Sequence, residues 1–351
     1  MRRVTTLASA LLAGALVLTA CGGSSDTAGT DSSPSASDSS APTSDLKVGL
    51  AYDIGGRGDQ SFNDAAAAGL DKAKSELGIE TKEAEASNGE PDSAKEERLR
   101  VLANAGYNPV IAVGFAYSAA VAKVAKELPD TNFAIIDDEA AVGDNIANLV
   151  FAEEQGSFLV GAAAALKSKT GNIGFVGGVD VPLIHKFEAG YEAGAKAVKS
   201  DIKVQVKYLT QPPDFSGFGD PAKGKTAAAG MYDAGADVVY QAAGGSGGGV
   251  FEAAKAANAM AIGVDSDQYK TADPSVQSVI ITSMLKKVDV AVYDFIKSAS
   301  EGNFTAGTVR YDLEKDGVGY STSGGAIDDI VSKLDDYKQK IISGEITVPT
   351  K

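Results

Sequence analysis

From residue 46 onward, short apolar runs alternate with longer amphipathic stretches, and this alternation restricts the fold more than any other feature. The first run, KVGLAYD at residues 47–53, precedes an expected helix at residues 63–77. Further apolar runs at residues 109–115 and 133–137 each follow another expected helix. Strands separated by helices pair in parallel, and the helices cover both faces of the sheet. The sequence therefore predicts an α/β fold with doubly wound parallel sheets.

The alternation restarts after an expected helix at residues 154–171, with further strands from residue 172 to residue 265. Two more helices are expected, at residues 281–302 and 329–344. A chain of 351 residues is long for a single core, so two lobes of similar size are expected. A cleft between such lobes is lined by the loops at the carboxyl ends of the strands.

The N-terminus has the pattern of an export signal, because Arg2 and Arg3 precede the apolar run LASALLAGALVLTA. This run ends in Leu-Thr-Ala-Cys21, which resembles the lipobox of bacterial lipoproteins. The resemblance implies that residues 1–20 are removed and that Cys21 carries a lipid. The alternative is a buried cysteine in a simple anchor helix. Residues 22–44 lack large apolar side chains, so residues 21–45 are expected to form a lipidated, disordered tether.

Composition excludes several classes of function. The 47 acidic and 32 basic residues give a net charge of -15, which argues against nucleic acid as a partner. The chain has one cysteine and one histidine, His185, so an intramolecular disulfide is impossible and most zinc sites and histidine-dependent triads are excluded. We expect no metal and no cofactor.

The ends of the expected strands carry glycines and carboxylates rather than nucleophiles and bases. They are Asp53, Gly114-Phe115, Asp137-Asp138, the stretch 177–180, the stretch 244–247 and Asp265. Glycine lets the backbone approach a ligand closely, and carboxylates accept hydrogen bonds from hydroxyl groups. This set favours binding over catalysis.

The loop between the first strand and the first helix, YDIGGRGDQSFN, is the richest of these positions. Asp53, Phe62 and Asn63 suit a small polar ligand with a flat apolar part, whereas Asp59 and Ser61 are expected to cap the helix. The alternative is an ordinary strand-to-helix turn in which all five residues are structural.

Several motifs in order resemble the basic membrane protein (BMP) family, the substrate-binding lipoproteins of ABC importers of the purine-nucleoside receptor type. They are the lipobox, YDIGGRGDQSFN, FAEEQGSFLVG, AAGGSGGGVFEAAK, IGVDSDQ and ITSMLKKVD. The resemblance implies two lobes of the type-I periplasmic-binding-protein fold joined by hinge strands. It also implies capture of a nucleoside without chemistry, delivery to an ABC permease, and a lipid-anchored monomer on the extracytoplasmic face of the cell membrane.

The resemblance also implies roles for single residues. Asp53 and Asn63 would hydrogen-bond the ligand from the first lobe, Phe62 would stack on the base, and Asp137 would add a contact. Asp265 would hold the ribose hydroxyls.

Three further contacts complete the expected site. Lys286, favoured over Lys287 by the family spacing, would reach the ribose region, and the glycine at position 244 would bring the backbone close to the ligand. A second ring would complete the sandwich, with Phe187 our choice and Phe218 the competitor. Without the resemblance, Phe187 could be core and Lys286 could lie on a solvated helix face.

Hinge strands imply a discontinuous division of the chain. We expect one lobe at residues 46–152 plus about 282–310, and the other at residues 153–281 plus about 311–351. Three alternatives to a nucleoside receptor remain: a binding protein for a sugar or other hydroxylated molecule, a ligand-sensing lipoprotein, and an exported nucleosidase. GGSGGG lacks the Gly-Lys-Ser/Thr ending of a phosphate loop, and KEERLR from Lys95 is expected to be a charged helix face.

Overall fold

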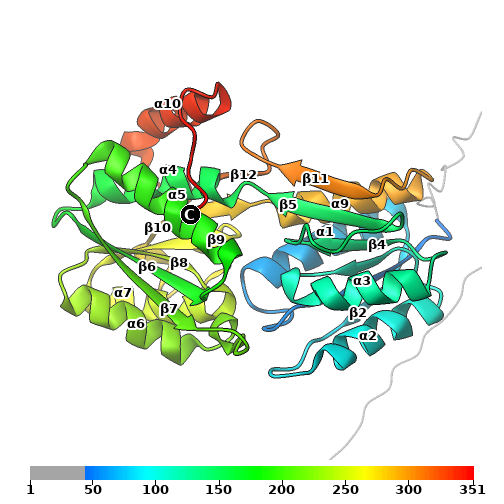
Figure 1. Cartoon of the computed structure of the whole chain (residues 1–351). Helices are drawn as coiled ribbons and strands as arrows, with labels where there is room; N and C mark the ends of the chain where they lie inside the picture. The colour runs from blue at the N-terminus through cyan, green and yellow to red at the C-terminus, as the bar shows by residue number, and fades with distance from the viewer. Residues whose placement is uncertain (1–43) are drawn as a thin grey trace, which may run out of the picture. The chain divides into compact units, whose positions relative to one another are not determined.

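The computed structural model describes residues 44–351, and these residues form two six-stranded sheets (Figure 1). The predicted signal peptide, the lipidated Cys21 and all but the last two residues of the predicted tether lie outside the described residues. Helices separate most consecutive strands, so the alternation of apolar runs and helices in the sequence is reproduced in the fold.

The first sheet has the strand order β11-β5-β4-β3-β1-β2 and is parallel throughout. With its helices we call it lobe 1. Its elements are β1 (Lys47–Ala51), α1 (Phe62–Leu77), β2 (Glu80–Ala84), α2 (Asp92–Asn104), β3 (Val110–Ala112), α3 (Ser118–Glu127), β4 (Phe133–Ile136), β5 (Ile146–Phe151), α9 (Val288–Ser300) and β11 (Gly307–Tyr311). Helix α9 belongs here because it packs on α1.

The second sheet has the order β12-β10-β9-β8-β6-β7, and only its edge strand β12 is antiparallel. With its helices we call it lobe 2. Its elements are α4 (Glu153–Lys167), β6 (Asn172–Val179), α5 (Pro182–Val198), β7 (Lys203–Thr210), α6 (Pro221–Asp233), β8 (Val238–Ala242), α7 (Gly247–Ala257), β9 (Met260–Asp265), α8 (Gln268–Thr271), β10 (Ile280–Lys286), β12 (Val318–Tyr320) and α10 (Val331–Ile342).

The chain passes between the two sheets three times, after β5, after β10 and after β11. The single helix expected at residues 281–302 is wrong, because its first part is strand β10 and α9 begins only at Val288. Strand β10 is almost entirely buried, so its continuous apolar run had no period that distinguished a strand from a helix. The second passage therefore falls after Lys286, whereas the expected division placed it at about residue 282.

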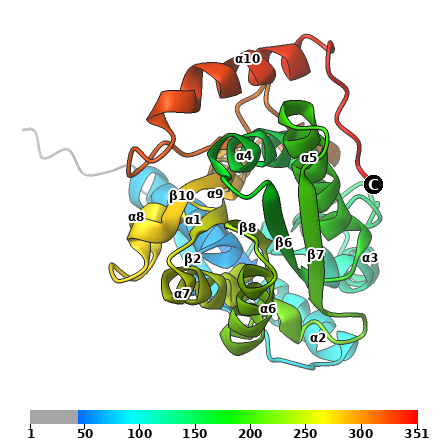
Figure 2. The same cartoon turned by 90° about the vertical axis from the view of Figure 1, so that its left-hand side faces the viewer.

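Glycines allow helices α4 and α5 to pack closely on one side of the second sheet. A Cβ atom at Gly161 or at either of Gly190 and Gly194 would overlap the main-chain oxygen of the facing helix. Helix α10 lies over this pair, where Tyr337 contacts Phe158 edge-on at 5.5 Å between ring centroids (Figure 2). Within residues 44–351, no helix is both long and apolar enough to cross a membrane.

We predict that Gly194→Ala lowers the free energy of unfolding by about 1–3 kcal/mol, because the new methyl group would meet the carbonyl of Phe158. The measurement is urea unfolding followed by circular dichroism, since the chain has no tryptophan.

The matched control is Gly230→Ala at an exposed position of helix α6, where an added Cβ would meet no atom within 4 Å. This control should leave stability unchanged or raise it by up to about 1 kcal/mol. Equal unfolding midpoints for the two variants would contradict the close packing of α4 and α5.

Candidate functional site

The loop between β1 and α1 is organised by hydrogen bonds of its own side chains. Asp59 accepts hydrogen bonds from the main-chain N–H groups of Ser61, Asn63 and Asp64 at 2.9, 2.9 and 3.1 Å, and so caps α1. Asn63 accepts one from the N–H of Asp53 at 3.0 Å and donates one to Asp59 at 3.0 Å. The loop therefore holds its shape through contacts within lobe 1.

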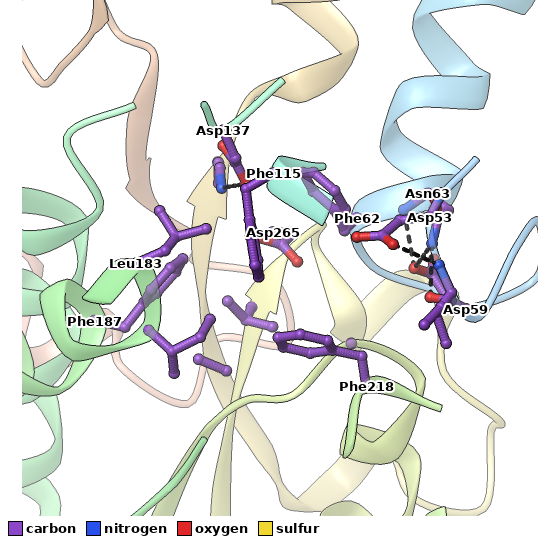
Figure 3. Close-up of a pocket in the computed structure, with 16 residues that line it drawn as sticks. Asp53, Asp59, Phe62, Asn63, Phe115, Asp137, Leu183, Phe187, Phe218 and Asp265 are labelled. Carbon is purple, nitrogen blue, oxygen red and sulfur yellow. Dashed lines mark hydrogen bonds and ion pairs between the residues drawn. The ribbon is translucent and has the colours of Figure 1, made fainter. Parts of the chain in front are cut away.

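A cavity lies between the two lobes at the carboxyl ends of their strands (Figure 3). All eight residues expected from the sequence to contact a ligand line this cavity. They are Asp53, Phe62, Asn63, Asp137, Phe187, Gly244, Asp265 and Lys286. Lobe 1 contributes the first four of these residues and lobe 2 contributes the last four. Residues that are more than 200 positions apart in the sequence are thus brought together.

The carboxyl group of Asp53 is buried against the backbone of lobe 1. Its Oδ1 accepts a hydrogen bond from the N–H of Ile54 at 2.8 Å. Gly114, with φ of 97°, leaves the space beside Asp53 free, since a Cβ there would overlap the carboxylate. Burial is the largest effect on the group, and it raises the pKa of Asp53 to about 6.

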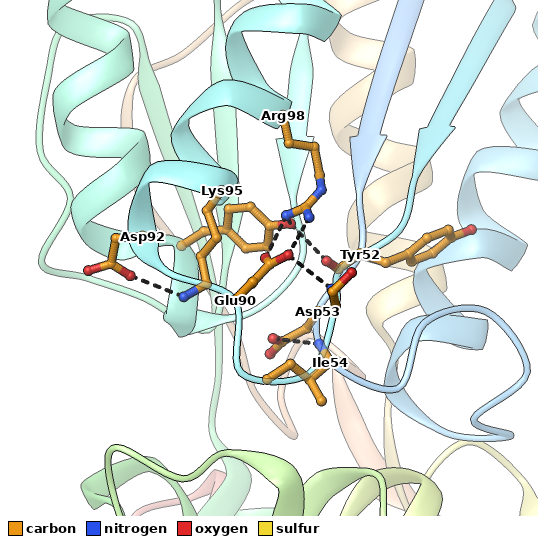
Figure 4. A network of polar contacts seen from close by, with 9 residues as sticks. Tyr52, Asp53, Ile54, Glu90, Asp92, Lys95 and Arg98 are labelled. Atoms are coloured by element: carbon orange, nitrogen blue, oxygen red, sulfur yellow. Dashed lines mark hydrogen bonds and ion pairs between the residues drawn. The ribbon is translucent and has the colours of Figure 1, made fainter.

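A network of polar contacts within lobe 1 supports the end of β1 (Figure 4). Arg98 donates two hydrogen bonds to the carboxylate of Glu90, at 2.7 and 2.5 Å, and a third to the hydroxyl of Tyr117 at 2.7 Å. That hydroxyl donates to the main-chain oxygen of Tyr52 at 2.9 Å, one residue before Asp53. The stretch KEERLR lies on helix α2 (Asp92–Asn104), as expected for a charged helix face, but the side chain of Arg98 is only 13% exposed because it is paired with Glu90.

Lys286 is the central charge of the site. Its side chain is 2% exposed at the end of β10 and forms ion pairs with Asp137 of lobe 1 and, at 3.3 Å, with Glu153 at the start of α4. The ammonium group also lies 5.0, 5.1 and 5.5 Å from the ring centroids of Phe62, Phe151 and Phe187, respectively. The solvated helix face considered as an alternative for Lys286 is therefore wrong.

The electrostatics of this cluster follow from burial and pairing. Burial alone would lower the pKa of Lys286, but the carboxylates of Asp137, Glu153 and Asp265 raise it above its usual range. Burial raises the pKa of Asp137 to about 7 despite the opposing effect of Lys286. Among the described residues, Asp137 Oδ1 is buried without a hydrogen-bond partner. One acceptor at the cavity wall is thus free.

Asp265 faces these groups from lobe 2. It ends β9 with a left-handed φ of 61°, and burial raises the pKa of its carboxyl to about 6. Its Oδ2 accepts a hydrogen bond from the hydroxyl of Ser61 in lobe 1 at 2.6 Å. Within residues 44–351, no hydrogen bond involves Asp265 Oδ1. The lobes are therefore in direct polar contact beside the cavity.

Aromatic rings reach the cavity from both lobes. Phe62 and Phe115 come from lobe 1, whereas Phe187 and Phe218 come from lobe 2 (Figure 3). Both candidates for the second stacking ring thus line the same space. Phe115 also contacts Phe215 of lobe 2 edge-on, with 6.0 Å between ring centroids.

The sequence interpretation missed three residues of this region. Phe115 follows a strand end that was noted, but it was not chosen as a ligand contact. Glu153 was missed because its role depends on the passage between the sheets. Ser61 was expected to cap α1, and this is wrong, because its hydroxyl makes no capping bond and crosses to Asp265 instead.

Lys286 and Lys287 are clearly distinguished by the structure. Lys287 pairs with Asp316 at the surface, and only Lys286 lines the cavity. His185 lies outside the cavity and pairs with Asp180 at 2.7 Å. No group of three His, Cys, Asp or Glu side chains in the described part of the chain is placed to hold a metal ion. The arrangement offers hydrogen-bond acceptors, one ammonium group and aromatic faces.

Comparison with known proteins extends these observations. A model of the Bmp family, described as "ABC transporter substrate-binding protein PnrA-like", matches residues 46–351. The "ABC transporter nucleoside-binding protein BmpA" of Lactococcus lactis is 37% identical to this chain, covering 100% of it and 99% of the relative. An uncharacterized lipoprotein of Pyrococcus abyssi is 36% identical over 78% of this chain and 69% of its own length.

Solved structures agree with the fold. A solute-binding protein of an ABC transporter system from Aeropyrum pernix K1 superposes with a TM-score of 0.75 at 32% identity, covering 87% of this chain and 94% of that protein. The predicted two-lobed α/β fold of the type-I periplasmic binding proteins is confirmed.

We predict that Asp53→Asn raises the melting temperature at about pH 7.5 but not at about pH 4. The pKa of Asp53 is about 6 in the folded protein, above the 3.8 of an unburied aspartate, so ionisation of the carboxyl costs folding free energy that grows as the pH rises from about 4 to about 6. The neutral amide avoids this cost, which is up to about 3 kcal/mol at neutral pH and disappears below the unfolded pKa.

Thermal melts across this pH range provide the measurement. The matched control is Asp130→Asn, which removes one negative charge at an exposed position. If the rise in melting temperature of Asp53→Asn is independent of pH, or equals that of the control, burial of the Asp53 carboxylate is not the cause of the rise.

Proposed function

Because this chain belongs to the Bmp family of ABC transporter substrate-binding proteins, we propose that its cavity captures a nucleoside, with a purine base favoured. The captured nucleoside would be delivered to the permease of an ABC importer. The nucleoside-binding name of the Lactococcus lactis relative supports this choice of ligand. The predicted resemblance to the family is confirmed by the family match.

The observation that carries the proposal is the joint placement of aromatic rings and acidic side chains from both lobes around one cavity. A nucleoside has a flat base and a hydroxylated ribose, and these two parts need different partners. Stacking of a base on an aromatic ring contributes about 1–3 kcal/mol and tolerates different bases. Hydrogen bonds from hydroxyls to a carboxylate contribute about 1.5–3 kcal/mol each.

In this proposal the base lies against Phe62 of lobe 1, and Phe187 of lobe 2 covers its other face. Phe218 remains the competitor for that second position. Asp265 accepts hydrogen bonds from the ribose hydroxyls, and Lys286 lies in the same region.

The remaining predicted contacts have smaller roles. Asp53 and Asp137 offer carboxylate oxygens from lobe 1, and Gly244 brings the main chain of lobe 2 to the cavity. Asn63 lines the cavity, but its amide already bonds to Asp53 and Asp59, so its main effect is to hold the loop in place.

We further propose that the protein binds its ligand without converting it. Asp53, Asp137 and Asp265 lie at or just after the ends of three different strands, and Asp137 is paired with Lys286. Release of free base from inosine during prolonged incubation would instead support a nucleosidase.

A lipid on Cys21 would anchor this monomeric receptor to the extracytoplasmic face of the cell membrane. The lipoprotein name of the Pyrococcus abyssi relative supports this location. Intact-mass measurement of the mature protein should give a chain that begins at Cys21 and carries acyl groups. An unmodified cysteine, or retention of residues 1–20, would contradict the anchor.

We predict that the wild-type protein binds inosine or adenosine and that Asp265→Ala lowers this affinity by about 100-fold or more, because two charge-assisted hydrogen bonds are lost. Isothermal titration calorimetry with inosine, adenosine, ribose and free bases provides the measurement. In the same titrations, Phe187→Ala should weaken binding more than Phe218→Ala.

The melting temperature of Asp265→Ala without nucleoside controls for misfolding and should stay close to that of the wild type. Unchanged affinity in this variant would refute the role of Asp265. Tight binding of ribose without any response to nucleosides would favour the alternative of a sugar receptor.

A further inference from the structure

Ser61 occupies the N-cap position of α1, but its side chain does not cap the helix. No hydrogen bond links its hydroxyl to the first turn, and Asp59 performs that role. The hydroxyl is fully buried and points away from its own lobe. It donates to Asp265 Oδ2 at 2.6 Å, while the main-chain oxygen of Val264 lies farther away, at 3.4 Å. Its one proton is therefore directed at the carboxylate.

Two further side chains of lobe 2 fix the position of this segment. The Ser266 hydroxyl donates to the main-chain oxygen of Ser61 at 3.0 Å. The Gln268 amide nitrogen donates to the main-chain oxygen of Gln60 at 3.0 Å. Gln60 itself has a left-handed φ of 56°. The segment 60–61 of lobe 1 is thus held by hydrogen bonds to Asp265 and from Ser266 and Gln268 of lobe 2.

The side chain of Gln268 is locked in the orientation that this contact needs. Its carbonyl oxygen accepts hydrogen bonds from the amide of Gln241 at 2.8 Å and from the N–H of Val264 at 2.9 Å. Both lone pairs of the oxygen are therefore used within lobe 2, and the amide nitrogen is left to face Gln60. Lobe 2 presents a fixed surface to the segment that carries Ser61.

From this geometry we infer that Ser61 is a positioning residue for ribose recognition. Its hydroxyl, in lobe 1, holds Oδ2 of Asp265 in lobe 2. The other carboxylate oxygen, Oδ1, then faces the ligand. The inference rests on the proposed binding of a nucleoside. It extends that function by making the ribose-binding carboxylate complete only when the segment 60–61 of lobe 1 is in place. Recognition of the sugar then requires the contact between the two lobes.

Charge and burial support this role. Asp265 is 8% exposed, and an ionised carboxylate in such surroundings needs hydrogen-bond donors. Ser61 supplies one of them, and its hydrogen bond opposes the rise in the pKa of Asp265 that burial causes. Without Ser61, Oδ2 would be free to rotate toward Lys286 or the ligand, and the hydroxyl groups of the ribose would meet a less ordered acceptor.

The test compares two variants with two ligands by isothermal titration calorimetry. Inosine carries the 2′- and 3′-hydroxyls of the ribose, and 2′,3′-dideoxyinosine lacks both but keeps the 5′-hydroxyl. We expect Ser61→Ala to weaken inosine binding about tenfold and dideoxyinosine binding less than about twofold. A residue that acts through Asp265 affects only the ligand that Asp265 recognises.

Ser266→Ala is the matched control, since it also removes a part-buried hydroxyl hydrogen bond between the lobes, but the Ser266 hydroxyl does not bond to the carboxylate of Asp265. Ser266→Ala should weaken the binding of both ligands by the same factor. If Ser61→Ala weakens the binding of both ligands equally, Ser61 only holds the lobes together. If it changes neither affinity, Ser61 has no role in binding. Either result overturns the inference. Wild-type protein that binds neither ligand would refute the proposed function, and the inference with it.

Discussion

The ammonium group of Lys286 is the interaction on which the organisation of the site depends. It is buried at the end of β10, where it can remain charged only because Asp137 and Glu153 supply opposite charge. These partners come from the end of β4 and the start of α4, so one ion cluster brings together both sheets and one passage between them. Removing one member would leave a buried charge uncompensated, at a cost of about 3–5 kcal/mol. The cluster therefore fixes how the strand ends face each other.

Around this cluster, most polar groups are used to hold the site and few are left for a ligand. Asp59 and the amide of Asn63 order the β1–α1 loop, and Arg98 supports the end of β1 through Tyr117. Among the buried oxygens without partners in the described structure, Asp137 Oδ1 belongs to a residue that lines the same cavity as the rings. Because these side chains are already ordered, ligand binding costs little conformational entropy at this site.

The sequence predicted the fold class and the cavity residues at strand ends, such as Asp53, Asp137 and Asp265, because parallel strands place their carboxyl ends together whatever their order in the chain. Phe187 and Lys286 were expected only from the resemblance to the family. Prediction from the sequence failed where the answer depended on contacts between distant segments. The run ending at Lys286 was expected to be helical, because a strand that is almost entirely buried shows no alternation of apolar and polar residues. Ser61 looked like a helix cap because its acceptor, Asp265, lies 204 positions away. The burial of Arg98 against Glu90 was not predicted, because only the folded loop brings the two side chains together.

The three passages between the sheets have a further consequence for how this chain can be divided. The edge strand β11 pairs with β5 although some 150 residues separate them, and α9 covers α1 from the same late segment. A fragment that ends before α4 would contain five strands of the first sheet but would expose the edge of β5 and the apolar side of α1. Neither lobe is a continuous segment of the chain. During synthesis, lobe 1 is therefore completed only after nearly all of lobe 2 has been made.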